Sequence, residues 1–373
     1  MKKRLAIVFG GNSVEHEISI LSMIQASCAV DNDQYEIVHV YLTKEGEFWV
    51  GPKFNQLQTF QKGKFKYYRV TFYKRQGRLY LKGIKPFLPF KYRKPIDVVL
   101  PIVHGNNIED GSLAGYFNIF NVPYASSSVL TAAIFQNKYY TKVFLSAFSI
   151  NVLPYLYFSI KDYKKDVFQV LEQSGKLGFP LIVKPVSLGS SIGIKIAENR
   201  DQLIKALNYA LKYDNDLIVE KKLTNYRELN QAVLINDDDF MLSDIEEVKS
   251  SNHYLTFDDK YMPADSKRDI PADLSSSLSA KIAGLTNKIA TIFRPQGVIR
   301  IDYLYDADSD MVYINEINSI PGSLSFYLFE GKISFSELIE KLVYSAVKNK
   351  YKRDLKLTSF QSNVLLSKRH MKK

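Results

Sequence analysis

Two apolar segments near the C-terminal end carry polar residues that could bind a metal ion. In IRIDYLY, Arg300 and Asp302 are two residues apart, and in VYINEINSIPG the same spacing separates Glu316 from Asn318. Because alternate residues of a strand point to the same face, each pair lies on one side of its strand. If the two strands pair through the turn DADSDM, three oxygen ligands converge beside an arginine. Such a set suits Mg²⁺, which carboxylates hold together with substrate phosphates.

Ion pairing within the sheet is the alternative, in which Arg300 pairs with Asp302 or Glu316 on an exposed sheet face. Carboxylates are costly beside an apolar layer unless a cation meets them. The spacing predicts that four isoleucines of these strands are buried: Ile299, Ile301, Ile314 and Ile317. We therefore favour the metal site over the ion pair.

Two glycine-containing loops could contact an anion. GGNSVEHEIS follows the first apolar run and opens a helix, so its backbone N–H groups form an anion or dipole site, although it lacks the second half of a dinucleotide fingerprint. VKPVSLGSSIGI joins Lys184 to a loop of small residues that lets backbone amides approach phosphates. It is not a P-loop, because no Gly-Lys-Ser/Thr follows. Either loop alone is also compatible with an ordinary tight turn.

Strand and helix signals alternate along the chain, which indicates an α/β fold with a parallel sheet. Continuous apolar runs predict strands at residues 4–11, 35–43, 96–105, 179–185 and 216–223, and helical periodicity predicts helices over 128–148 and 200–213. The blocks that result are an N-terminal domain over 1–125, a central unit over 126–229 and a C-terminal unit over 230–347. A basic insert at about 51–94 and a basic tail over 348–373 complete the chain.

The net charge of +11 is unevenly distributed. Residues 51–94 contain 13 Lys or Arg and no Asp or Glu, and the tail carries nine basic residues against Asp354, so the rest of the chain is acidic. The insert alternates charged with aromatic residues around Gln76-Gly77, which predicts a half-exposed β-hairpin. Stacking on single-stranded nucleic acid is the alternative for such a pattern. We favour the hairpin, and for the tail a solvated helix end, so we expect no nucleic-acid partner.

The remaining features favour a cytoplasmic protein. The apolar run after MKKR is too short for a signal peptide, and no segment approaches the roughly 20 apolar residues that span a bilayer, so we expect no membrane contact. The single cysteine, Cys28, cannot form an internal disulfide. Its helical spacing with Val14, Ile18 and Leu21 predicts a buried thiol.

Five motifs in this order resemble those of the D-alanine–D-alanine ligases of the ATP-grasp superfamily: GGNSVEHEIS, HGNNIEDGSLAG, VKPVSLGSSIGI, FDDKYMPA and RIDYLY followed by INEINSIPG. The resemblance covers the chain except the basic insert and the tail. It implies three α/β domains, an N-terminal parallel-sheet domain and two further domains that hold ATP between them. It also implies two Mg²⁺ ions, with Mn²⁺ as an alternative, and a homodimer that binds D-alanine and ATP.

The resemblance assigns site residues by position. The ATP-binding set is Lys138, Lys184, Gly189, Ser191, Glu220 and Glu228. The metal ligands are Asp302, Glu316 and Asn318. The catalytic set is Glu15, Ser190, Tyr261, Arg300 and Gly322, and the substrate-binding set is His104, Lys260 and Tyr327.

Within these sets the resemblance implies specific roles. Glu15 holds the ammonium of the first amino acid, and Ser190 and Tyr261 connect it to a loop around Lys260 that covers the site. Arg300 and the backbone N–H of Gly322 stabilise the oxyanion, a kind of contact whose loss costs on the order of 3 kcal/mol in the barrier.

Three positions depart from the family pattern. Ile108 stands where the family has glycine, and Tyr226 with Arg227 lengthens the turn before Glu228. Tyr327 stands where the family has a serine that helps to bind the carboxylate of the second substrate. An acceptor other than D-alanine, such as D-serine or D-lactate, is therefore a second candidate.

The sequence favours a ligase that joins two D-alanines for peptidoglycan precursors. A polyanion-binding protein with a vestigial nucleotide site is the alternative from another class. The retained metal ligands, both phosphate lysines and Arg300 argue against it.

Overall fold

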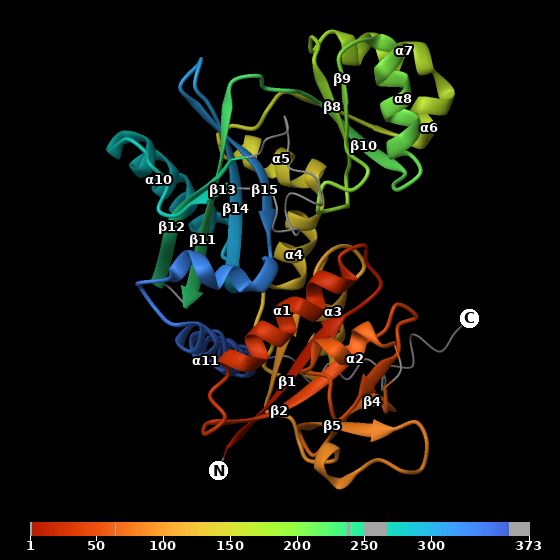
Figure 1. Ribbon diagram of the computed structural model, residues 1–373, viewed down its shortest axis with the longest axis vertical. Coiled ribbons are helices and arrows are strands. Elements are labelled where there is room, and N and C mark those ends of the chain that lie inside the picture. The colour runs from red at the N-terminus through yellow and green to blue at the C-terminus, as the bar shows by residue number, and fades with distance from the viewer. Residues whose placement is uncertain (1, 64, 237–238, 250–266, 358–373) are drawn as a thin grey trace, which may run out of the picture.

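Three β-sheets form three lobes in the computed structural model, which describes residues 2–63, 65–236, 239–249 and 267–357 (Figure 1). A six-stranded sheet builds the lower lobe, a four-stranded sheet the small upper lobe, and a five-stranded sheet lies to the side of the small lobe and above the lower one. The α/β architecture predicted from the sequence is confirmed. Within the described ranges, none of the helices has the length and apolar character that crossing a bilayer requires.

The first sheet contains the parallel strands that the sequence predicts. β1 (Lys3–Gly10) pairs in parallel with β2 (Tyr35–Leu42) on one side and with β6 (Val98–Ile102) on the other. Strands β3, β4 and β5 extend this sheet in antiparallel order beyond β2. The other elements of this lobe are α1 (His16–Ala29), β3 (Phe48–Val50), α2 (Leu57–Gln61), β4 (Tyr68–Arg75), β5 (Arg78–Gly83), the 3₁₀ helix η1 (Phe90–Tyr92) and α3 (Ser112–Phe120).

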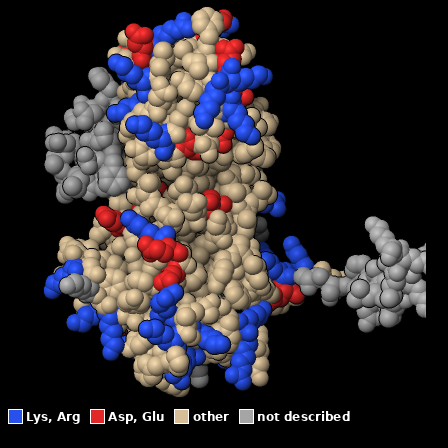
Figure 2. All heavy atoms as spheres, turned by 90° about the vertical axis from the view of Figure 1, so that its right-hand side faces the viewer, with Lys and Arg blue, Asp and Glu red and all other residues tan. Residues whose placement is uncertain are grey.

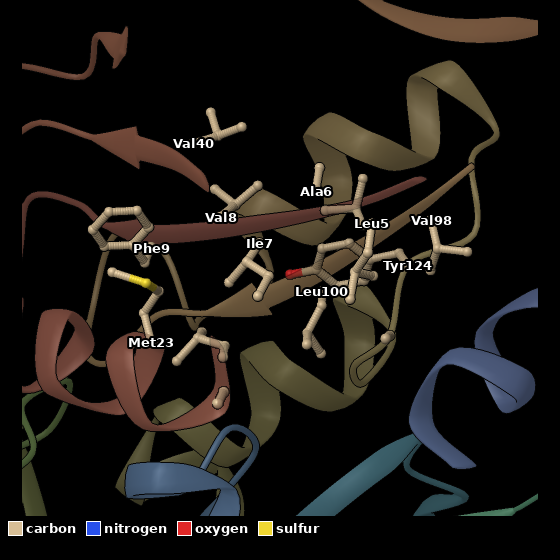
Figure 3. Packing of buried hydrophobic residues seen from close by; sticks show 14 of the residues in the cluster. Leu5, Ala6, Ile7, Val8, Phe9, Met23, Val40, Val98, Leu100 and Tyr124 are labelled. Carbon is tan, nitrogen blue, oxygen red and sulfur yellow. The ribbon is translucent and has the colours of Figure 1, made fainter. Parts of the chain in front are cut away.

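The core of this lobe surrounds β1. Its residues 5–9 are fully buried, as expected for a parallel strand that is covered on both faces. Figure 3 shows them beside Met23 of α1, Val40 of β2 and Leu100 of β6. This packing fixes the position of the loop after β1. The loop leads into α1, and acidic residues lie at the beginning of that helix.

The basic insert forms the hairpin that the sequence predicts. β4 and β5 pair in antiparallel register from Val70 opposite Gly83 to Arg75 opposite Arg78. Gln76 and Gly77 have φ values of 48° and 78°, the left-handed conformation that a two-residue turn requires. Buried and exposed side chains alternate along both strands, so the hairpin is half-exposed.

The second sheet is antiparallel and has the order β7-β10-β8-β9. Its two central strands are those predicted at 179–185 and 216–223. The elements of this lobe are β7 (Tyr155–Ser159), α6 (Ile160–Lys165), α7 (Val167–Gly175), β8 (Leu181–Pro185), β9 (Lys195–Ala197), α8 (Arg200–Ala210) and β10 (Asp216–Lys221).

The single helix predicted over 128–148 is wrong, because the chain forms two helices there. α4 (Val129–Gln136) and α5 (Lys138–Ala147) meet at Asn137, whose φ and ψ of −94° and 104° are not helical. The Asn137 side chain accepts a hydrogen bond from the Tyr140 N–H at 3.0 Å and so caps α5. The break places Lys138 at the first position of a new helix.

The third sheet is antiparallel with the order β13-β12-β11-β14-β15. All four isoleucines predicted to be buried are at most 3% exposed, which confirms that prediction. The elements are β11 (Tyr226–Asn236), β12 (Asp239–Lys249), β13 (Lys267–Asp269), α10 (Ser276–Phe293), β14 (Gly297–Asp306), β15 (Met311–Asn318), η2 (Gly322–Phe329) and α11 (Phe335–Asp354).

The prediction that Cys28 is buried is wrong. Cys28 is exposed, and Val14 and Leu21, which share its helical spacing, are 44% and 45% exposed, whereas Ile18 of the same stripe is 7% exposed. The buried face of the helix instead carries residues such as Met23 and Ala26. Both stripes have helical spacing, and only the contact with β1 decides which one faces the core.

The domain borders at 125/126, 229/230 and 347/348 stay predictions. β11 begins at Tyr226, so the change from the second to the third sheet falls just before it. α4 and α5 pack against β15 although they precede the second sheet in the chain. Residues 358–373 of the basic tail lie outside the described residues.

Truncation of Ile301 tests the burial of the third sheet. Ile301→Ala should lower the free energy of unfolding by about 3 kcal/mol, since this fully buried side chain would leave a cavity. Ile119→Ala is the matched control, because Ile119 is 82% exposed and its loss should cost less than about 0.5 kcal/mol. Urea unfolding of both variants measures the difference, and equal losses would contradict the assigned packing.

Candidate functional site

A cavity of about 470 Å³ lies where the three lobes meet. Most of the residues predicted for the site line it: Glu15, His104, Lys138, Gly189, Ser190, Glu228, Arg300, Asp302, Glu316, Asn318, Gly322 and Tyr327. A smaller cavity of about 80 Å³ adjoins it at Glu228 and is lined by the other predicted ATP-binding residues Lys184, Ser191 and Glu220. Lys260 and Tyr261 lie outside the described residues.

The polar residues of β14 and β15 face each other across the pair. Asp302 lies opposite Glu316, and Arg300 lies opposite Asn318. The guanidinium of Arg300 donates to both carboxylate oxygens of Asp302, at 2.6 and 2.8 Å, and Asn318 Nδ2 donates to the same carboxylate at 3.2 Å. Burial alone would lower the pKa of Arg300, but Asp302 outweighs it and raises the pKa well above its usual value.

The ion pair and the set of metal ligands, which the sequence offered as alternatives, are therefore both present in this arrangement. Arg300 pairs with Asp302, as the ion-pair alternative expects. At the same time two carboxylates and one amide oxygen, from Asp302, Glu316 and Asn318, line the same cavity from adjacent strands. This oxygen-rich donor set fits a hard divalent cation.

Two buried lysines flank these acids. Lys138 Nζ lies 3.4 Å from Glu316 Oε2 and donates to the carbonyl oxygen of Leu188 at 2.5 Å. Lys184 Nζ donates to Asn315 Oδ1 at 3.0 Å. Asn315 is the extra residue of a β-bulge between Asp302 and Tyr303 in the β14–β15 register. β14 and β15 thus place the carboxylates of Asp302 and Glu316 in the main cavity and the amide of Asn315 beside Lys184.

Lys142 is a site residue that the sequence analysis missed. Glu220 is fully buried, and its two carboxylate oxygens lie 2.8 Å from Lys142 Nζ and 2.7 Å from Lys184 Nζ. Burial would raise the pKa of Glu220, but the two lysines outweigh it and lower the pKa to about 2. Lys142 lies four residues after Lys138 on one helix face, a spacing that could have revealed it.

Glu15 connects the first lobe to the loop after β8. It precedes α1 and accepts a hydrogen bond from Ser190 Oγ. A Cβ on Gly189 or on Gly105 would come within 2.8 Å of Glu15 Oε2, so a side chain at either position would displace this carboxylate. Ser190 itself has a φ of 51°, in the left-handed region.

Glu109 is a second residue that the sequence analysis missed. Its carboxylate accepts hydrogen bonds from the Gly105 N–H at 2.9 Å, the Ile320 N–H at 2.8 Å and Ser319 Oγ at 3.1 Å. Burial, and then the nearby charge of Glu15, raise the pKa of Glu109 to about 7. Glu109 therefore joins the loop after β6 to the residues directly after β15.

His104 strengthens the same junction. Its Nδ1 lies 2.8 Å from the Ile320 carbonyl oxygen and its Nε2 lies 3.0 Å from Ser22 Oγ. Burial lowers the pKa of His104 to about 4, so the ring is neutral at physiological pH. Ile108, four residues further along, stands where the family has glycine. Its φ is not in the left-handed region, and its side chain fills the space that a Cβ on Gly11 would need.

The far end of the cavity is built around Tyr327. Its hydroxyl donates to Glu246 Oε2 at 3.4 Å, and burial raises the pKa of Tyr327 to about 12. Arg268 Nη1 lies 3.3 Å from Glu246 Oε1, and the guanidinium stands 5.7 Å from the centre of the Tyr327 ring. Asn230 Nδ2 donates to Glu246 at 2.9 Å. A tyrosine and an ion pair therefore form this wall.

Solved structures that resemble this chain include two that are titled as ligases. The VanG D-Ala:D-Ser ligase from Enterococcus faecalis matches with a TM-score of 0.78 and 25% identity over 93% of this chain and 100% of that chain. The D-alanine-D-alanine ligase from Coxiella burnetii matches with a TM-score of 0.79 and 25% identity over 95% of this chain and 96% of that one. The fold and the site define an ATP-grasp ligase.

Sequence comparison gives the family. The D-ala D-ala ligase N-terminus family matches residues 4–127, and the D-ala D-ala ligase C-terminus family matches residues 144–344. A D-alanine--D-alanine ligase from Chloroherpeton thalassium is 34% identical over 365 residues, which cover 95% of this chain and 99% of that protein. The chain belongs to the D-alanine–D-alanine ligase family, as its motifs predict.

Removal of the Lys142 charge tests the buried ion network. Lys142→Met should lower the free energy of unfolding by about 3 to 5 kcal/mol, because Glu220 then keeps a buried charge with one cation fewer. Lys165→Met, on the exposed surface of α6, should be nearly neutral.

The double variant Lys142→Met/Glu220→Gln separates charge from packing. It should recover part of the lost stability, since the uncompensated charge is gone. If thermal or urea unfolding finds it no more stable than the single variant, packing rather than charge explains the loss.

Proposed function

We propose that this protein joins two D-alanines with ATP, through an acyl phosphate, to make the dipeptide of peptidoglycan precursors. One observation carries the proposal. Two adjoining cavities bring the carboxylate of Glu15, two buried lysines and the oxygen ligands of β14 and β15 together. Membership of the family supports an ATP-dependent ligase. The names of the relatives support D-alanine as substrate.

ATP binds between the second and third sheets in this proposal. Lys138 and Lys184 neutralise its phosphates, and the loop that contains Gly189 and Ser191 covers them. Glu220 holds Lys184 in place from behind, while Glu228 lies at the junction of the two cavities, where we place the nucleoside.

Divalent cations bind at Asp302, Glu316 and Asn318, whose oxygens fit Mg²⁺. We propose that the site holds two Mg²⁺ ions, with Mn²⁺ as an alternative metal. When bound, they supply neutralisation of the phosphoryl group as it moves. Asp302 also accepts two hydrogen bonds from Arg300, which keep the guanidinium aimed along the strand face.

Glu15 binds the ammonium of the first D-alanine. The carboxylate of that D-alanine attacks the γ-phosphorus, which releases ADP and leaves an acyl phosphate. The amine of the second D-alanine attacks the acyl carbon, loses a proton, and the tetrahedral intermediate expels phosphate as the peptide bond forms. Arg300 and the Gly322 N–H stabilise its oxyanion. The neutral side chain of His104 lines the cleft. Tyr261 and Lys260 lie outside the described residues, so their proposed roles are those that the family resemblance implies.

A different acceptor is the second candidate, and Tyr327 favours it. The similar VanG structure is titled a D-Ala:D-Ser ligase. In this chain the hydroxyl of Tyr327 already donates to Glu246, so the acceptor meets a bulkier group than a serine, with its proton engaged. D-Serine and D-lactate remain acceptors to be compared with D-alanine. We also propose that the protein forms a homodimer in the cytoplasm. A vestigial nucleotide site is disfavoured, because most of the predicted site residues line the two adjoining cavities.

A phosphate-release assay tests the function. Purified protein with ATP and Mg²⁺ should release phosphate when D-alanine is added, and mass spectrometry should identify D-alanyl-D-alanine. Phosphate release only with a second acceptor such as D-serine would assign the alternative. No release with any acceptor of the panel would refute the ligase proposal.

Neutral substitutions at the strand acids test the cation site. Asp302→Asn and Glu316→Gln should each reduce turnover by roughly a hundredfold or more while the thermal unfolding midpoint changes little, since these residues line a cavity. Asp308→Asn, in the exposed turn between the same strands, is the matched control. Near wild-type turnover of both variants at saturating Mg²⁺ would remove the site.

Loss of one hydroxyl tests the acceptor wall. Tyr327→Phe should raise the KM of the acceptor about tenfold, the effect of about 1 to 3 kcal/mol expected where a buried polar contact is broken. The KM values of ATP and of the first D-alanine should not change. Tyr305→Phe removes a hydroxyl of the same sheet away from the cavity and serves as control. An unchanged acceptor KM would show that Tyr327 only packs.

A further inference from the structure

One surface segment of the first lobe exposes large apolar side chains among cations. Residues 82–94, here called the basic loop, comprise the last two residues of β5 and most of the segment that leads from it to β6. Leu88 and Tyr92 point into the core, with 3% and 6% of their surface exposed. Ile84, Phe87 and Phe90 point outward and are 57%, 66% and 77% exposed. Three such side chains within seven residues are an unusual concentration on a protein surface.

Buried contacts hold the basic loop in this shape. The guanidinium of Arg4, itself only 4% exposed, donates to the carbonyl oxygen of Lys94 at 2.6 Å and also to that of Lys91. Arg93 Nε donates to the Leu88 carbonyl oxygen at 2.6 Å. The backbone is therefore fixed from inside, and the phenylalanines are exposed because the anchored backbone turns them outward.

The charge around these side chains has one sign. Between residues 51 and 94 the sequence has 13 Lys or Arg and no Asp or Glu. In the described part of this segment, Arg69 and Lys94 are the cations that lie within 4.0 Å of a carboxylate oxygen, on Glu47 and Glu36. Lys82, Lys85, Lys91 and Arg93 are exposed beside the apolar side chains. Figure 2 shows Lys and Arg gathered on the lower lobe, where β4 and β5 lie in Figure 1.

We propose that the basic loop docks this protein on an anionic lipid surface. Phe87, Phe90 and Ile84 enter the headgroup region, while the lysines around them face lipid phosphates. Aromatic and aliphatic side chains bordered by Lys and Arg are the combination that binds membrane interfaces, where apolar burial and attraction to anionic lipid add together. The proposal goes beyond the ligase function and does not depend on it. It departs from the expectation of no membrane contact, which rested on the lack of a segment that could span a bilayer and does not bear on docking at the surface.

Other occupants fit this surface less well. A second copy in a two-fold contact would place the same patch against itself, and like charges would then face each other. Single-stranded nucleic acid binds by stacking on open aromatic faces. In the neighbouring hairpin Tyr73 stacks on Tyr80 with ring centres 5.6 Å apart, and Tyr67 stacks on Trp49 at 3.8 Å. These rings are already paired with each other, whereas the exposed aliphatic Ile84 suits lipid.

Vesicle sedimentation with the full chain tests the proposal. The protein should sediment with vesicles of phosphatidylcholine and phosphatidylglycerol at about 50 mM salt and remain in solution with phosphatidylcholine alone, and higher salt should weaken binding. Phe87→Ser/Phe90→Ser should lower the affinity for the anionic vesicles about tenfold or more, because two aromatic side chains that enter the lipid are lost. Lys82→Glu/Lys85→Glu should abolish binding.

Matched controls lie on other lobes. Leu130→Ser removes an apolar side chain of α4 that is 71% exposed, and Lys161→Glu/Lys165→Glu reverses two exposed charges of α6. Both controls should bind anionic vesicles like the unchanged protein. The changed side chains are exposed, so all variants should keep the same unfolding midpoint and the same rate of phosphate release with ATP and D-alanine.

Three outcomes would overturn the proposal. They are absence of sedimentation with anionic vesicles at low salt, equal binding of the unchanged protein to neutral and anionic vesicles, and unchanged anionic-vesicle binding of the phenylalanine variant. Tight binding of a single-stranded oligonucleotide that the lysine variant loses and the phenylalanine variant keeps would assign the surface to nucleic acid instead.

Discussion

The pairing of β14 with β15 is the constraint on which the site depends. Its register places Asp302 opposite Glu316 and Arg300 opposite Asn318 on one face, while the isoleucines between them are buried on the other. A shift by one residue would turn the carboxylates into the core and the isoleucines into the cavity. The apolar core behind the sheet therefore holds the oxygen ligands in position, because any slip would cost the burial of four isoleucines and leave charges in an apolar layer.

The cavity exists only because three lobes meet, and a few buried polar contacts make the junction. Glu109 binds the backbone directly after β15, His104 binds the Ile320 carbonyl, and Ser190 reaches Glu15 from the second lobe. Each contact satisfies a group that would be costly to bury alone. Movement of one lobe relative to another would break these contacts together, so the junction links the geometry of the lobes to the geometry of the site.

The cations of the molecule form two groups, one inside the site and one on the surface of the first lobe. Cations inside the site are matched by acids, as in the network of Lys142, Glu220 and Lys184. On the basic loop of the first lobe most cations face solvent beside exposed phenylalanines. Much of the excess positive charge of the chain therefore lies on residues 51–94, which do not line the cavity, and its chemistry suits a different partner from the nucleotide.

The sequence by itself determined the strand periodicity, the hairpin at Gln76-Gly77 and the residue types of the site, because these follow from local spacing and turn chemistry. It could not decide which of two helical stripes of α1 is buried, so Cys28 was misplaced, and it did not show that Asn137 ends one helix and caps the next. Glu109 and Lys142 were missed because their partners, Ile320 and Glu220, are distant in sequence. Only the tertiary structure brings such groups together, since burial and long-range pairing, rather than local pattern, set the cost of their charge.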